Sequence, residues 1–123
     1  MSAKRILVAD DERSVAISIR HMLEIYGYEI EEVYQGSEVL RRISESSFDL
    51  LLLDFDMRDI KGDRICLLMR EDDKLRALPV IIITAHIEVD ERIFKEYGAD
   101  AVLYKPVESE DLIRAVKKCL KET

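Results

Sequence analysis

Four short runs of consecutive apolar residues recur along the chain, and they restrict its possible folds more than any other feature. The runs cover residues 6–9, 50–53, 80–83 and 101–103. Continuous rather than alternating apolar runs are typical of strands buried on both faces of a parallel sheet. A fifth run, residues 28–34, mixes acidic residues with β-forming ones. That mixture favours a strand at a partly exposed sheet edge.

The segments between these runs carry a helical period instead. Apolar residues recur at helical spacing over residues 15–26 and 112–120, and weaker patterns cover residues 37–46, 63–72 and 89–97. Strands that alternate with helices favour right-handed crossovers and a parallel sheet covered on both faces. The sequence therefore predicts an α/β fold, a doubly wound (βα)5 unit around a five-stranded parallel sheet.

The length, net charge and first residues of the chain limit its number of domains, its binding partners and its location in the cell. A length of 123 residues, 48% of them hydrophobic, predicts one domain over residues 1–123. A net charge of −7 disfavours direct binding to nucleic acid. Acidic residues 10–12 interrupt the first apolar run at once, so it makes neither a signal peptide nor a membrane span. We expect a cytoplasmic protein whose widely separated Cys66 and Cys119 are ordinary buried thiols.

Chemically active side chains follow four of the five predicted strands. Ligands of open parallel sheets bind beyond the carboxyl ends of the strands, so these positions matter most. They hold Asp10 and Asp11 after the first run, Asp54 and Asp56 after residues 50–53, Thr84 after residues 80–83, and Lys105 after residues 101–103. We therefore expect carboxylates, a hydroxyl and an ammonium group at one rim of the sheet.

This set of side chains points to metal-assisted phosphoryl transfer. Two carboxylates about 4 Å apart repel by roughly 4 kcal/mol at an effective dielectric constant near 20, and a whole domain is stable by only about 5–15 kcal/mol. A divalent cation would offset that repulsion, and hard oxygen ligands favour Mg²⁺ over zinc. Lys105 would add a second positive charge. Phosphoryl transfer needs this positioning and neutralisation, with Asp54 as the candidate nucleophile that becomes an acyl phosphate.

Each of these residues also has a purely structural interpretation. Asp11 or Ser14 could simply cap the first helix. Thr84 could be an ordinary β-branched residue at a strand end, and Lys105 a solvated surface lysine. Asp54 is harder to explain in this way, because a carboxylate at the end of a central buried strand needs a partner. The placement of all these residues at one rim favours the functional interpretation.

Together these motifs resemble the receiver domain of two-component response regulators, over essentially the whole chain. The resemblance is carried by Asp10-Asp11, by Asp54 at the end of residues 48–54, by Thr84-Ala85, by Gly98-Ala99-Asp100 and by Lys105-Pro106. It implies a flavodoxin-like fold with strand order 2-1-3-4-5. It also implies a protein that is not an enzyme on other molecules and undergoes only self-phosphorylation and autodephosphorylation at Asp54.

The same resemblance implies roles for the individual residues. Asp54 would accept a phosphoryl group from a phosphohistidine of a sensor histidine kinase or a histidine phosphotransfer protein. Mg²⁺ would be held by Asp11, Asp54 and the backbone carbonyl of Asp56, with Asp10 assisting, commonly through water. Lys105 would pair with the phosphoryl group and Thr84 would hydrogen-bond it. The Lys105–Pro106 peptide would be cis, and a downstream protein target would read the result through protein contacts.

Several positions depart from the family pattern. Arg58 stands where the family usually has Pro, and Lys61-Gly62 where Asp-Gly is common. Val102 occupies the place of the switch aromatic, while Tyr104 directly precedes Lys105. We expect Tyr104 or a backbone shift to report phosphorylation instead. In receiver domains, the positions of Asp56 and His86 tend to tune the lifetime of the phosphoryl group.

Two other functions use similar residues. Residues 51–56 also resemble the opening motif of haloacid-dehalogenase-type phosphatases. That family places its nucleophile first and its acidic pair last, whereas here Asp10-Asp11 comes first. The second alternative is a receiver-like scaffold that no longer accepts phosphate, and Arg58 and the missing switch aromatic favour it. Against it, every residue needed for phosphoryl and metal binding is present.

Overall fold

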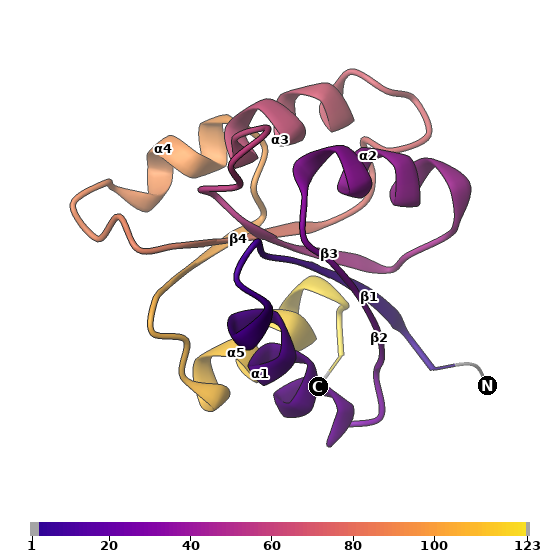
Figure 1. Ribbon diagram of the computed structural model, residues 1–123, viewed down its shortest axis with the longest axis vertical. Coiled ribbons are helices and arrows are strands. Elements are labelled where there is room, and N and C mark those ends of the chain that lie inside the picture. Colours follow the sequence, from indigo (N-terminus) through magenta and orange to yellow (C-terminus); the bar gives the residue numbers. More distant parts are fainter. Residues whose placement is uncertain (1–2, 123) are drawn as a thin grey trace.

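A central parallel sheet carries helices on both faces in the computed structural model, which describes residues 3–122 (Figure 1). Strands and helices alternate along the chain, as predicted. In order, the elements are β1 (Arg5–Ala9), α1 (Arg13–Glu24), β2 (Glu29–Val33), α2 (Gly36–Glu45), β3 (Leu50–Asp54), α3 (Gly62–Arg70), β4 (Val80–Thr84), α4 (Glu91–Glu96), β5 (Ala101–Tyr104) and α5 (Ser109–Cys119). Among the described helices, none combines the length and the apolar character that crossing a membrane requires.

The strand order is β2-β1-β3-β4-β5, and all four neighbouring pairs run parallel. This order confirms the flavodoxin-like fold and the edge position predicted for β2. Every residue of β3 and β4 is buried. The order reverses between β1 and β3, and in doubly wound folds the crevice at such a point is the usual ligand site.

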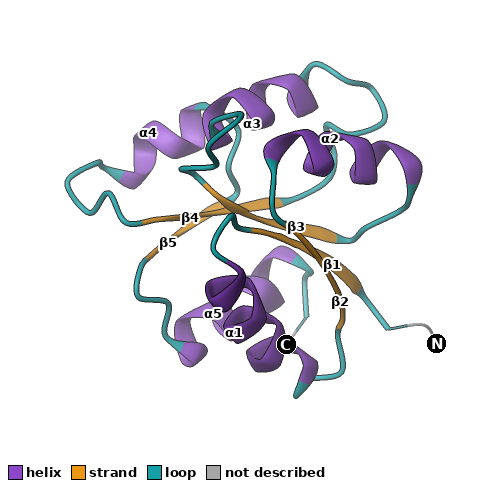
Figure 2. Ribbon diagram, in the orientation of Figure 1, coloured by secondary structure: helices purple, strands orange, loops and turns teal. Residues whose placement is uncertain are grey.

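Helices α2, α3 and α4 cover one face of the sheet and α1 and α5 the other (Figure 2). A hydrophobic core lies on each face. Successive side chains of a strand point to opposite faces. Leu51 and Leu53 therefore pack under α2, α3 and α4, whereas Leu50 and Leu52 pack against α1 and α5. Each inner strand needs apolar residues on both faces, which explains its continuous apolar run.

The acidic edge strand β2 is neutralised by arginines from two helices. Glu31 accepts a hydrogen bond of 2.9 Å from Nη2 of Arg42 in α2, and Glu32 pairs with Arg20 in α1. The hydrogen bond from Arg42 and its charge hold the pKa of Glu31 below its usual value, against the opposing effect of burial. These ion pairs allow a charged strand to lie at the sheet edge.

Helix α4 is shorter than the predicted residues 89–97. It begins at Glu91 because Asp90 is its N-cap, whose side chain accepts a hydrogen bond of 2.9 Å from the Arg92 amide. Asp at this position satisfies one of the free N–H groups of the first turn. The preceding residue, Val89, stays in the β4–α4 loop.

The two cysteines differ in their surroundings. Cys66 in α3 is buried, and burial raises the pKa of its thiol to about 12. Cys119, at the end of α5, is only half-buried. The prediction of two buried thiols is therefore correct for Cys66 and wrong for Cys119.

Candidate functional site

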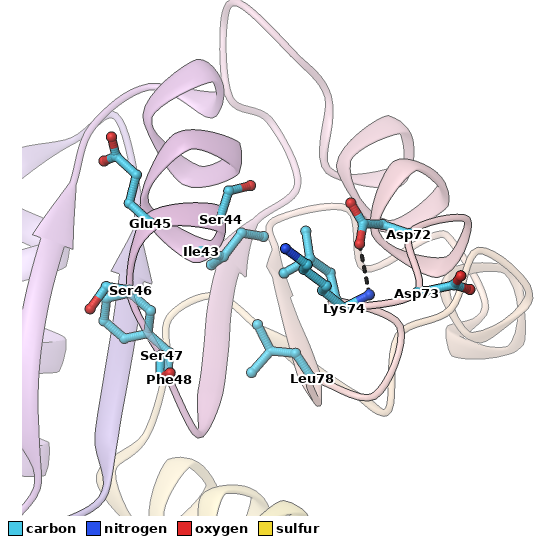
Figure 3. Close-up of a pocket in the computed structure, with 11 residues that line it drawn as sticks. Ile43, Ser44, Glu45, Ser46, Ser47, Phe48, Asp72, Asp73, Lys74 and Leu78 are labelled. Carbon is cyan, nitrogen blue, oxygen red and sulfur yellow. Dashed lines mark hydrogen bonds between the residues drawn. The ribbon is translucent and has the colours of Figure 1, made fainter.

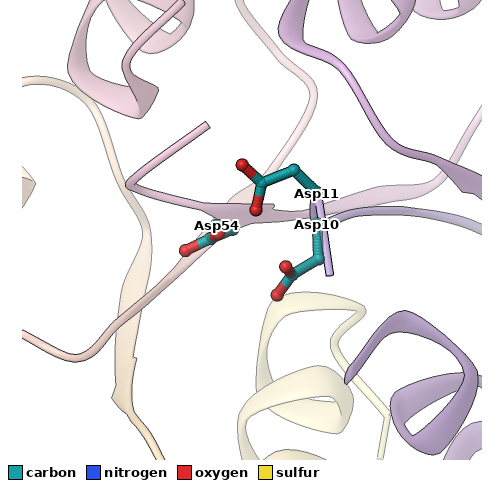
Figure 4. Close-up of side chains that lie close together, drawn as sticks. All are labelled: Asp10, Asp11 and Asp54. Carbon is teal, nitrogen blue, oxygen red and sulfur yellow. The ribbon is translucent and has the colours of Figure 1, made fainter. Parts of the chain in front are cut away.

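Three carboxylates meet where β1 and β3 end side by side (Figure 4). One oxygen each from Asp10, Asp11 and Asp54 lies within 4.8 Å of the others. Ala9 pairs with Leu53 in the sheet, which brings the residues that follow them to the same rim. Asp10 is 1% exposed and Asp54 is 4% exposed. The structure thus brings together the three acidic side chains that the strand ends predict.

Asp10 is the most deeply buried carboxylate of the cluster. Its Oδ1 accepts a hydrogen bond of 2.9 Å from the Glu12 amide. Its Oδ2 is buried and accepts no hydrogen bond from the described part of the chain, although Lys105 Nζ lies 3.2 Å away as a counter-charge. A buried carboxylate oxygen in this state is costly unless a positive charge compensates it. The donors are all carboxylate oxygens, so the cluster fits a hard cation such as Mg²⁺.

Lys105 supplies one fixed positive charge to this cluster. It follows β5 directly, and its Nζ lies 3.5 Å from Asp54 Oδ1 as well as close to Asp10. Burial alone would lower the pKa of Lys105, but the charges of Asp54 and Asp10 outweigh it and leave the pKa raised. Lys105 therefore stays protonated at neutral pH. The following Lys105–Pro106 peptide is cis, as the family resemblance implies.

Asp54 is the carboxylate whose ionisation the site opposes. Burial raises its pKa most, and the charge of Asp10 raises it further. Lys105 and the Asp56 amide, which donates to Asp54 Oδ1 at 3.3 Å, counteract only part of this effect. Lys105 and the exposed Arg58 supply two positive charges against three carboxylates, so the cluster still lacks positive charge. A divalent cation or the protonation of Asp54 would relieve this deficit.

Thr84 completes the rim at the end of β4. It follows Ile83, the residue paired with Asp54, and it is fully buried. Its hydroxyl oxygen accepts a hydrogen bond of 3.0 Å from the His86 amide. A hydroxyl can accept and donate at the same time, so accepting from His86 leaves the Thr84 hydrogen free to donate.

The carboxylate of Asp56 is not one of the three that form the cluster. Its Oδ2 lies 2.8 Å from His86 Nε2, and its Oδ1 lies 3.5 Å from Lys61 Nζ. Glu88, on the other side of the imidazole, raises the pKa of His86 by hydrogen bonding, and the charge of Asp56 raises it further. The sequence did not predict the Asp56–His86 contact. The only sign of this contact in the sequence is that both residues follow neighbouring strands, β3 and β4.

Asp11 does not cap the first helix. The N-cap of α1 is Glu12, and no side-chain hydrogen bond caps this helix, so the capping role for Asp11 or Ser14 is wrong. Oδ2 of Asp11 instead lies 3.4 Å from Nε of Arg58, in the β3–α3 loop. The sequence pointed to Arg58 only as an unusual residue, without a partner.

Two surface grooves lie at opposite ends of the sheet. A groove of about 510 Å³ adjoins Lys105, and a second, of about 770 Å³, lies between the α2–β3 and α3–β4 connections (Figure 3). The second is lined by residues such as Ile43, Phe48 and Lys74, and by none of the predicted site residues. The first is lined by Glu12, Ser14, Val15, Ser18, Ile19, Met22, Lys105, Pro106 and Val107.

Comparison with known proteins shows the family of this chain. Residues 6–117 match the family model described as the response regulator receiver domain. This chain belongs to that family. The receiver domain's acidic cluster of Asp10, Asp11 and Asp54 fits the family's phosphorylation site.

Curated relatives of the receiver domain are response regulators. The phosphate regulon transcriptional regulatory protein PhoB of Rhizobium meliloti is 32% identical over 118 residues, which cover 95% of this chain and 52% of PhoB. The response regulator MprA of Mycobacterium ulcerans is 37% identical over 122 residues, which cover 97% of this chain and 51% of MprA. The receiver domain thus spans about half the length of these relatives.

Solved structures agree with this assignment. A putative response regulator from Chloroflexus aurantiacus superposes with a TM-score of 0.93 at 30% identity, covering 98% of this chain and 100% of the other. The chemotaxis response regulator CheY4 of Vibrio cholerae gives a TM-score of 0.89 at 26% identity, covering 97% and 100% of the two chains. The receiver domain therefore has the fold that the resemblance implied.

Proposed function

We propose that this receiver domain, as a single phosphoacceptor domain, takes a phosphoryl group onto Asp54 with the help of Mg²⁺. The donor is a phosphohistidine of a sensor histidine kinase or a histidine phosphotransfer protein in the cytoplasm. The observation that carries the proposal is the position of Asp54. It is a nearly buried carboxylate at the end of the central strand β3, close to Lys105 and within an acidic cluster that could hold a cation.

The transfer forms one bond and breaks another. A carboxylate oxygen of Asp54 attacks phosphorus in line with the donor's N–P bond. The electron pair of that bond leaves with the imidazole nitrogen, and the donor ring, protonated at its other nitrogen, departs as neutral imidazole. Lys105 neutralises one phosphoryl oxygen, and the Thr84 hydroxyl donates to another. Bound Mg²⁺, held by Asp11, Asp54 and the carbonyl of Asp56 with Asp10 assisting, would neutralise the carboxylates and the phosphoryl oxygens.

The groove beside Lys105 is where the donor would dock. Its apolar lining includes Val15, Ile19 and Met22 on one face of α1 and Val107 after β5. A donor helix whose apolar residues fill this groove would hold its phosphohistidine near Lys105 and the site. The resulting aspartyl phosphate is read by a downstream protein target, because a net charge of −7 disfavours direct contact with nucleic acid.

Hydrolysis returns the domain to its starting state. A water molecule attacks phosphorus, the bond to the Asp54 oxygen breaks, and inorganic phosphate leaves. This reaction acts on the domain's own phosphoryl group. A haloacid-dehalogenase-type phosphatase, by contrast, would turn over external phosphate monoesters.

Phosphorylation by a small acyl phosphate tests the proposal. Incubation with acetyl phosphate and Mg²⁺ should give a protein mass increased by one phosphoryl group, and Asp54→Asn should abolish it. Asp73→Asn, at a side chain 90% exposed in the α3–β4 connection, is the matched control and should be modified normally. Absence of any adduct on the wild-type protein would favour the scaffold, and steady release of phosphate from monoesters would favour the phosphatase.

A further inference from the structure

Arg58 brings a positive charge to the acidic cluster at a position where receiver domains usually have Pro. Its Nε lies 3.4 Å from Oδ2 of Asp11. The Arg58 side chain is 89% exposed, whereas that of Asp11 is only 18% exposed. The guanidinium therefore approaches the cluster from the solvent side.

The neighbours of Arg58 hold its backbone in this position. Met57 on one side is fully buried in the core under α2, α3 and α4. Asp59 on the other side accepts hydrogen bonds from the amides of Gly36 at 2.7 Å and Ser37 at 2.9 Å, at the start of α2. The loop backbone is thus anchored on both sides of Arg58, which keeps this side chain within reach of Asp11.

The positive charges at this rim are divided among the carboxylates. Lys105 lies against Asp10 and Asp54, as described above. Lys61 and His86 contact Asp56. Within the described part of the chain, Arg58 is the one cation that pairs with Asp11. Because the Arg58 side chain is so exposed, the Arg58–Asp11 ion pair is weak and can be displaced. The ion pair of Lys105 with Asp10 is more deeply buried.

We propose that Arg58 is a resident counter-ion of Asp11 which a divalent cation must displace, so that Arg58 raises the Mg²⁺ concentration needed to prepare Asp54 for phosphorylation. The inference rests on the proposed function, since it requires that Mg²⁺ binds this cluster. A guanidinium keeps its charge at every physiological pH, so it competes with the cation under all such conditions. A Pro at this position would not compete.

Calorimetric titration of Mg²⁺ into unphosphorylated protein measures this competition without an activity assay. Removing one positive charge next to a divalent ion should strengthen binding about three- to ten-fold at low salt. We therefore expect Arg58→Ala to bind Mg²⁺ tighter by that factor and Arg58→Lys, which keeps the charge, to bind within about two-fold of wild type. The matched control is Arg114→Ala, an exposed arginine paired with Asp111 in α5, and it should leave the affinity unchanged.

The salt dependence separates a charge effect from a change in loop shape. At about 1 M salt the Debye length falls to about 3 Å, so the advantage of Arg58→Ala should shrink toward wild type. Equal or weaker Mg²⁺ binding by Arg58→Ala, beside normal binding by wild type, overturns the role of Arg58 and leaves the proposed function intact. Absence of Mg²⁺ binding in wild type and variant alike overturns the metal site itself, and the role of Arg58 with it.

Discussion

At the scale of single residues, Asp54 carries a negative charge that its surroundings oppose. Burial and the charge of Asp10 raise its pKa from 3.8 to about 6. We therefore expect Asp54→Asn to stabilise the protein in a chelating buffer at neutral pH, by about 1–3 kcal/mol. Urea unfolding followed by circular dichroism measures this gain. The control, Asp73→Asn, should change the free energy of unfolding by less than about 0.5 kcal/mol.

The pH dependence of this effect has a definite sign. A carboxyl whose pKa is higher in the folded state binds more protons when folded, so the wild-type free energy of unfolding falls as pH rises between 3.8 and about 6. The advantage of Asp54→Asn should thus be absent below that window and complete above it. Saturating Mg²⁺ should remove the advantage, because a ligand at 100 times its Kd stabilises the wild type by about 2.7 kcal/mol. A pH-independent gain would contradict the assignment to Asp54.

The placement of the candidate residues at one rim was easier to predict from the sequence than their contacts. Asp54 and Thr84 end their strands, and Asp10, Asp11 and Lys105 come just after theirs. The register of the sheet therefore brings these residues to one rim. The ion pairs that the loop residues form could not be predicted. Those ion pairs depend on side-chain directions that only the packed neighbours determine, as in the pairs Arg58–Asp11 and His86–Asp56.

At the scale of elements, Tyr104 links β5 to the loop before α4. Its hydroxyl donates a hydrogen bond of 2.8 Å to the carbonyl of Val89, while Val102 is buried in the core. Tyr104 pairs with Thr84 in the sheet, so it joins the end of β4, at the candidate site, to this loop. We expect Tyr104→Phe to loosen the loop, with amide exchange in residues 85–90 faster by about two- to ten-fold, the equivalent of about 0.5–1.5 kcal/mol. Hydrogen exchange followed by mass spectrometry measures it.

A second tyrosine near α4 provides the control. Tyr97 also packs against the core, but its hydroxyl makes no hydrogen bond to any described residue. Tyr97→Phe should therefore leave exchange in the loop unchanged. Equal exchange in wild type and Tyr104→Phe would show that the hydrogen bond to Val89 does not hold the loop, and that Tyr104 does not replace the usual aromatic.

The elements themselves were predictable to different degrees. The inner strands are marked by continuous apolar runs, because burial on both faces leaves no room for polar residues. The exact start of α4 was not predictable from its period. Asp90 caps the helix and Val89 is held by Tyr104, and both depend on contacts formed only in the folded protein.

At the scale of the whole molecule, the two cores depend on one sheet. Leu51 lies in the core under α2, α3 and α4, and its neighbour Leu52 lies in the core against α1 and α5. Both are fully buried in β3. Helices on either face pack on strands that the other face also needs, so neither layer should survive alone. We expect all the described elements to unfold in one transition.

Alanine at each of these adjacent leucines tests that cooperativity. Leu51→Ala and Leu52→Ala each remove a buried side chain from only one core, and each should lower the free energy of unfolding by about 2–5 kcal/mol. Both should shift the urea midpoint of the entire far-ultraviolet signal without changing the slope m, since the same surface unfolds in either case. A reduced slope or a second transition in only one variant would show that the layers unfold separately, and would contradict a single cooperative domain built on β3.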